Sequence, residues 1–147
     1  MSSNRAWSVR QKSKTANGAH FLIAKDGQIY QTASIYRVTW HVGKSQSRCF
    51  LKHKCSPAEF TKITQLEKSR AGKENVSRLE HKKPFPERFP FNTDSIGIEI
   101  VGFAYEKGEK EPVYEPVNQE QNDSLRWLVK QLAETLNVSM SEIYRHP

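Results

Sequence analysis

The sequence predicts a domain of mixed α and β structure, and three features carry this prediction. Two short β-prone runs flank an Asp-Gly pair, which is typical of a tight hairpin. An apolar, β-branched run at 96–101 indicates a buried strand, and a stripe of leucines after Asn118 indicates an amphipathic helix. With 147 residues, the chain is long enough for one domain with a real core but short for two.

The first predicted element is a hairpin built from the runs 20–23 and 28–32. Asp26 and Gly27 lie between these runs. A tight turn needs a positive φ, and glycine adopts it at little cost. We therefore expect two short strands joined at Gly27.

Residues 44–91 have the weakest pattern within the single domain that we expect to span 1–147. Ser56 followed by Pro57 predicts the start of a helix, because serine caps the first turn and proline suits the first helical position. Three prolines within 82–90 predict an extended surface loop.

The run 96–101 reads Ile-Gly-Ile-Glu-Ile-Val and predicts a strand buried on both faces in the middle of a sheet. Strand alternation places Glu99 on the face opposite the three isoleucines. Further on, Asn118 and Gln121 have the spacing of a capping box at the start of a helix. Apolar residues then recur every three or four positions up to Leu136 and form one stripe.

The two cysteines, Cys49 and Cys55, leave two alternatives open. They form a local disulfide in an oxidising compartment or stay as free thiols in the cytosol. Without a second pair, they do not support a structural zinc site with four ligands.

Composition and charge narrow the class of protein. No apolar run approaches the roughly 18 residues that span a bilayer, and the N-terminus lacks the apolar stretch of a secretory signal. The net charge of +7 favours polyanionic partners such as nucleic acid, an anionic cell wall or a membrane surface. Because the excess charge at 5–14 and 44–83 matches no basic helix or aromatic groove, we expect a solvated basic surface and no nucleic-acid site.

Glu99 is the strongest candidate for chemistry. A carboxylate inside an apolar run costs free energy unless it is paired, hydrogen-bonded or near a metal. Burial raises the pKa of a carboxyl group, as a general base that works near neutral pH requires. The alternative interpretation is a structural acid paired with a nearby lysine or arginine.

Four motifs, in this order, resemble the zinc-dependent N-acetylmuramoyl-L-alanine amidases, which share a fold with the peptidoglycan recognition proteins. The motifs lie at 18–31, 39–43, 92–102 and 144–147. The resemblance implies an α/β fold with a central mixed β-sheet flanked by helices. It also implies a zinc ion at the floor of a groove. The first metal-binding strand and the last metal ligand of the family do not appear, so the domain looks incomplete at both ends relative to it. Compared with compact members of the family, residues 44–91 look like a longer insertion within the domain.

The resemblance implies roles for three residues. Glu99 stands at the position of the family's proposed general base. His146 stands at that of one zinc ligand, and it is the one ligand of three that we can carry over. His41 lies in Trp-His-Val-Gly, which matches a Trp-His-Ala-Gly loop beside the substrate groove, and it is expected to assist the developing tetrahedral charge. By itself, a terminal histidine such as His146 is usually an ordinary surface residue.

Trp40, His20 and Asn92 are the substrate-binding residues that the resemblance implies. Trp40 would pack on an apolar part of a muropeptide, although a core aromatic residue is an equal alternative. His20, at the start of the hairpin, fits a structural role better than that of a metal ligand.

The implied reaction is hydrolysis of the bond between N-acetylmuramic acid and the L-alanine of the stem peptide, by zinc-activated water. The expected partner is peptidoglycan or a soluble muropeptide of the bacterial cell wall. One competing hypothesis is a peptidoglycan-binding module without catalysis, and another is an inactive, truncated fragment of such an amidase. The compartment stays open between the cell wall and cytoplasmic recycling.

Overall fold

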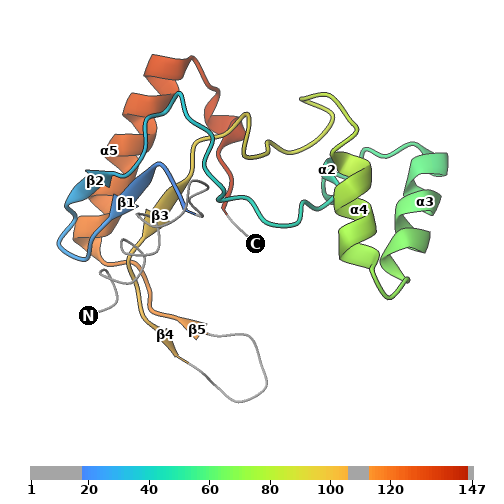
Figure 1. Cartoon of the computed structure of the whole chain (residues 1–147), viewed down its shortest axis with the longest axis horizontal. Helices are drawn as coiled ribbons and strands as arrows, with labels where there is room; N and C mark the ends of the chain where they lie inside the picture. Colours follow the sequence, from blue (N-terminus) through green and yellow to red (C-terminus); the bar gives the residue numbers. More distant parts are fainter. Residues whose placement is uncertain (1–17, 106–112, 146–147) are drawn as a thin grey trace. The chain divides into compact units, whose positions relative to one another are not determined.

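The computed structural model describes residues 18–105 and 113–145 (Figure 1). These residues divide into two compact units. Unit 1 contains the chain up to Thr39 and from Ile96 onward, and unit 2 contains Trp40–Ser95. A mixed sheet in unit 1 and helices in both units confirm the predicted α/β class. The expectation that 44–91 is an insertion within one domain stays a prediction.

Unit 1 contains a three-stranded sheet of β1 (Phe21–Ile23), β2 (Ile29–Gln31) and β3 (Ile98–Ile100) in the order β2-β1-β3. β1 pairs antiparallel with β2 and parallel with β3, so the sheet is mixed. The hairpin is confirmed. Gly27 has φ +82°, and a Cβ there would lie 2.9 Å from the carbonyl oxygen of Glu120, so both conformation and space require glycine.

The core of unit 1 lies between this sheet and α5 (Gln119–Leu136). Phe21, Ile23 and Leu128 are buried there together. The predicted capping box is present, since the Asn118 side chain accepts from the backbone N–H of Gln121 and the Gln121 side chain accepts from that of Asn118. α5 therefore starts where the sequence predicts.

The strand predicted at 96–101 is shorter and more exposed than expected. It pairs over Ile98–Ile100, and all three residues are half-buried. Among the described strands, β3 has β1 as its single neighbour and lies at the edge of the sheet. Ile96 and Ile98 pack against the core with α5. The apolar character of this run thus reflects contact on one face, and the expectation of burial on both faces in mid-sheet is not met in the described residues.

Three small elements complete unit 1. β4 (Ala104–Tyr105) and β5 (Val113–Tyr114) form a separate antiparallel pair, and η1 (Met140–Glu142) is a short 3₁₀ turn after α5. Lys25 forms an ion pair of 2.5 Å with Glu115, just after β5. This ion pair links the β1–β2 turn to the segment that follows the β4–β5 pair.

Unit 2 is helical and contains α2 (Arg48–Leu51), α3 (Pro57–Glu67) and α4 (Gly72–Glu80). α3 and α4 lie side by side (Figure 1). The predicted cap of α3 is present, since Oγ of Ser56 accepts from the backbone N–H of Glu59. Ile63 and Val76 are the buried apolar residues of this helix pair.

Cys49 and Cys55 form a disulfide, which decides between the two alternatives that the sequence leaves open. It closes the short loop between α2 and α3. Over the described part of the chain, we find no helix whose length and apolar character would let it cross a bilayer.

Candidate functional site

Glu99 lies at the centre of β3 and pairs in register with Leu22 of β1. Its neighbours along the strand, Ile98 and Ile100, pair with Phe21 and Ile23, whose side chains are buried in the core. Alternation along the strand therefore directs the Glu99 side chain to the sheet face opposite α5. Glu99 is half-buried there.

His20 is almost completely buried, with 1% of its surface exposed. Its Nδ1 accepts from the backbone N–H of Gly97 at 3.1 Å, and the Thr39 hydroxyl lies 3.1 Å from the same atom. Because Nδ1 is an acceptor, the ring hydrogen is on Nε2, which donates to the carbonyl of Arg37 at 2.8 Å. Both ring nitrogens of His20 are used inside unit 1, so the ring offers a metal no lone pair in this arrangement.

In unit 2, Asn92 holds the backbone of the Trp-His-Val-Gly loop. Its Oδ1 accepts from the N–H of His41 at 2.9 Å and from the N–H of Val42 at 2.7 Å. One side-chain oxygen thus joins two sequence motifs that lie 50 residues apart. The structure brings Asn92 and His41, two predicted site residues, into direct contact.

The His41 ring is oriented by Ser95. The Ser95 hydroxyl donates to the carbonyl of Phe91 at 2.5 Å and lies 2.9 Å from Nε2 of His41. Since a hydroxyl has one hydrogen, its oxygen accepts from Nε2–H of His41. The neutral ring therefore has its acceptor at Nδ1. The sequence contained Ser95 in the Ser-Ile-Gly-Ile-Glu motif but gave no sign of this role.

The loop that carries Asn92 and Ser95 has its own support. Asp94 accepts from the backbone N–H of Phe91 and from the Arg88 guanidinium at 2.8 Å. The Phe91 ring stacks on His81, with ring centroids 3.8 Å apart, and Arg88 lies over the same ring at 4.1 Å. Sequence reasoning missed these contacts, because charged and aromatic residues in a proline-rich loop give no spacing signal.

Trp40, the residue before His41 in the sequence, is exposed, with 55% of its surface accessible. Its aromatic side chain is therefore presented to solvent. His146 lies outside the described residues. Glu99 and His20 belong to unit 1, and Trp40, His41 and Asn92 belong to unit 2.

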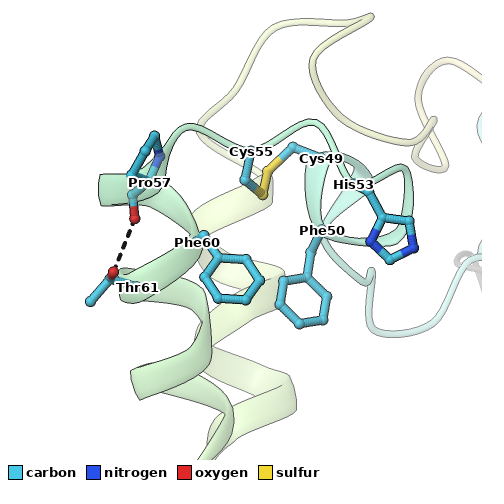
Figure 2. Close-up of a pocket in the computed structure, with 7 residues that line it drawn as sticks. All are labelled: Cys49, Phe50, His53, Cys55, Pro57, Phe60 and Thr61. Carbon is cyan, nitrogen blue, oxygen red and sulfur yellow. Dashed lines mark hydrogen bonds between the residues drawn. A yellow bond between two sulfur atoms is a disulfide. The ribbon is translucent and has the colours of Figure 1, made fainter.

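A pocket of about 380 Å³ lies beside the disulfide in unit 2 (Figure 2). Phe50 and Phe60 stack there, with ring centroids 5.4 Å apart, and in the view of Figure 2 they lie between Pro57 and Thr61 on one side and His53 on the other. None of the predicted site residues lines this pocket. The two cysteines drew attention to this region in the sequence. Cysteines alone do not indicate a pocket, so the sequence did not predict one.

The described residues include one cluster with the composition of a metal site, formed by Cys49, Cys55 and Glu59. It does not fit zinc, which binds thiolate sulfur, because both sulfurs are joined in the disulfide. Glu59 is in addition bound to Lys83. A zinc site would therefore need donors such as His146 from outside the described ranges.

Comparison with known proteins identifies the class. The chain matches a family model described as Amidase_2, N-acetylmuramoyl-L-alanine amidase, over residues 1–147. It belongs to this family, whose members are amidase-type hydrolases that act on peptidoglycan. No curated protein and no solved structure gave a significant match.

Proposed function

We propose that this chain hydrolyses the amide bond between N-acetylmuramic acid and the L-alanine of the stem peptide in peptidoglycan. The observation that carries the proposal is the family match over the whole chain, together with four motifs that stand in the family's order. The hydrogen bonds that hold the His41 loop in place also support the proposal, because a residue that assists a reaction must be fixed in position.

Glu99 is proposed as the general base. It accepts a proton from the attacking water and delivers it to the leaving amine, so one carboxylate serves both halves of the reaction. Its place on β3 fixes its backbone through the register with Leu22. Glu99 is half-buried on this strand, so part of the residue is removed from solvent.

His41 is proposed to stabilise the oxyanion that develops on the scissile carbonyl. Because Nε2–H donates to Ser95, a neutral ring can donate nothing from Nδ1. The oxyanion can therefore accept a hydrogen bond from Nδ1 of His41 only when the ring is protonated. This requirement gives the proposed role a signature in the pH dependence of turnover.

We further propose that zinc takes part and that His146 is one of its ligands. Bound zinc supplies an activated water and polarises the carbonyl in hydrolases of this kind. Trp40 offers its exposed ring to an apolar part of the muropeptide, as the family resemblance suggests. Asn92 contributes by holding the His41 loop, and His20 positions the backbone of Arg37 without contacting the substrate.

The test is a substitution that removes the carboxylate of the general base but keeps the size and shape of its side chain. Glu99→Gln should abolish release of L-alanine amino termini from peptidoglycan while muropeptide binding persists. The matched control is Glu134→Gln on the exposed side of α5, which should keep full turnover. Turnover that survives Glu99→Gln would remove the role assigned to Glu99.

The second candidate is a peptidoglycan-binding module without catalysis. It is favoured by the sequence, in which the family resemblance carries over one metal ligand of three, His146. The two functions separate by zinc content and chelator sensitivity. Stoichiometric zinc with chelator-sensitive turnover supports the amidase, whereas muropeptide binding without zinc or turnover supports the binding module.

A further inference from the structure

The positive charge of the chain is concentrated in unit 2. Residues 40–95 include twelve lysines and arginines against six aspartates and glutamates, which gives a net charge of +6. The whole chain has a net charge of +7, so all of unit 1 contributes +1. This asymmetry suggests that unit 2 meets an anionic partner.

Most acidic side chains of unit 2 form ion pairs, but few of its basic side chains do. Four of its six carboxylates are paired, those of Glu59, Glu74, Glu80 and Asp94. Within the described part of unit 2, seven exposed bases make no ion pair. They are Lys52, Lys54, Lys62, Lys68, Arg70, Lys73 and Lys82. The excess positive charge therefore lies on the surface of unit 2 and is not neutralised by ion pairs within it.

Three of these cations lie within six residues at the turn that joins α3 to α4. They are Lys68, Arg70 and Lys73, and all three are exposed. Lys73 stands in the first turn of α4, where the helix dipole disfavours a positive charge. Helix stability does not explain a cation at this position, which suggests that it serves binding.

We propose that the α3–α4 turn is a second binding surface that holds the protein on intact peptidoglycan, through the carboxylates of the stem peptides. The proposal rests on the proposed function and deepens it, because it assigns the polymeric wall as the substrate. A wall presents many carboxylates to one cationic turn, so it gains from multivalency. A soluble muropeptide carries few carboxylates and gains little.

The test measures co-sedimentation with purified sacculi, stripped of accessory polymers, in the Glu99→Gln background so that the wall stays intact. The test variant is Lys68→Gln/Arg70→Gln/Lys73→Gln. The matched control, Arg37→Gln/Arg126→Gln/Lys130→Gln, has the same net charge but changes exposed residues of unit 1. The Arg37 carbonyl that bonds to His20 is unchanged in it. Circular dichroism and thermal melting confirm that both variants are folded.

We expect the test variant to bind sacculi on the order of ten- to a hundredfold more weakly, as three cations near an anionic surface contribute. The control should change binding less than about threefold, and added salt should weaken binding of the parent. Blocking the wall carboxylates by amidation should reduce binding of the parent to the level of the test variant. Equal losses in both variants, or full binding to amidated sacculi, would overturn the proposal.

Two further arms keep this inference separate from the proposed function. In the background with Glu99 intact, the test variant should cleave soluble muropeptide at the parent rate and intact sacculi more slowly. If neither substrate is cleaved, the proposed function fails while the binding result still stands. If duplex DNA competes with sacculi at equal charge concentration and binds as tightly at physiological salt, the surface is a nucleic-acid site and the proposal is wrong.

Discussion

Nε2 of His41 donates to Oγ of Ser95 at 2.9 Å, and the Ser95 hydroxyl in turn donates a hydrogen bond to the carbonyl of Phe91. This short chain fixes both the orientation and the tautomer of the His41 ring. It also means that any effect of His41 on an oxyanion depends on a proton at Nδ1. Under the proposed function, Ser95 is a positioning residue that acts through His41.

Ser95→Ala should lower kcat about fivefold with little change in KM, because the loss of one orienting hydrogen bond corresponds to about 1 kcal/mol. It should also change the pH profile of kcat, since without Ser95 the neutral ring can carry its hydrogen on Nδ1 and donate from there to the oxyanion, so that protonation is no longer required. Ser95→Thr keeps the hydroxyl and should restore both values. Steady-state kinetics on soluble muropeptide across pH measure the effect, and an unchanged profile in the alanine variant would contradict the role of Ser95.

We expect position 92 to tolerate only a side chain that has the shape of Asn92 and keeps its hydrogen-bond acceptor. Asn92→Asp keeps an oxygen for the N–H groups of His41 and Val42, whereas Asn92→Leu leaves two partly buried donors without their acceptor. Each such loss costs about 1–3 kcal/mol. We expect the leucine variant to melt several degrees lower and to lose most activity, with the aspartate variant near the parent. If both variants melt alike, Asn92 does not hold this loop.

The sequence was most informative where the determining contacts are local. The capping box at Asn118 and Gln121, the cap at Ser56 and the turn at Gly27 each involve residues within four positions of one another. Short-range hydrogen bonds and backbone conformations fix such features, so a few side chains suffice to predict them.

Long-range features were harder to predict. The His41–Ser95 contact joins residues 54 positions apart, and neither residue type specifies the other. The apolar run at 96–101 predicted burial on two faces, because the sequence cannot show whether a second layer covers the strand. The disulfide likewise depends on where Cys49 and Cys55 are placed, which spacing alone does not decide.

Reduction of the disulfide should destabilise unit 2. Cys49 and Cys55 are 6 positions apart, and closing so short a loop stabilises the folded state by roughly 2 kcal/mol in the chain-entropy model. Cys49→Ser/Cys55→Ser should therefore lower the melting temperature, and a reductant should have that effect on the parent but not on the variant. An equal response of both proteins would show that the reductant acts elsewhere.

Lys83 is the charge on which the helix packing of unit 2 depends. It pairs with the fully buried Glu80 at 2.5 Å and with Glu59 on α3. Lys83→Met would leave the Glu80 carboxylate uncompensated, at a cost of about 3–5 kcal/mol. Glu80→Gln/Lys83→Met removes both charges and keeps an oxygen for the backbone N–H of Arg48, so urea unfolding should show it to be more stable than the single variant. A double variant as unstable as Lys83→Met would refute this account.

The same cluster predicts how stability changes at alkaline pH. Burial opposes the charged form of Lys83, but hydrogen bonds and charges from Glu59 and Glu80 outweigh it and raise the pKa of Lys83 above its usual 10.5. The folded state then holds the proton more tightly than the unfolded state. The stabilisation is complete below pH 10.5 and is lost as the pH rises through the raised pKa.

Acid should act through different groups. A hydrogen bond from Lys44 lowers the pKa of Glu74, and one from Lys25 lowers the pKa of Glu115, so both contribute stability that is lost as the pH falls below 4.5. Urea unfolding across pH should thus show both an alkaline and an acid decline in the parent. Glu80→Gln/Lys83→Met should keep the acid decline and lose most of the alkaline one. An alkaline decline of the same size in the double variant would assign it to groups other than Lys83.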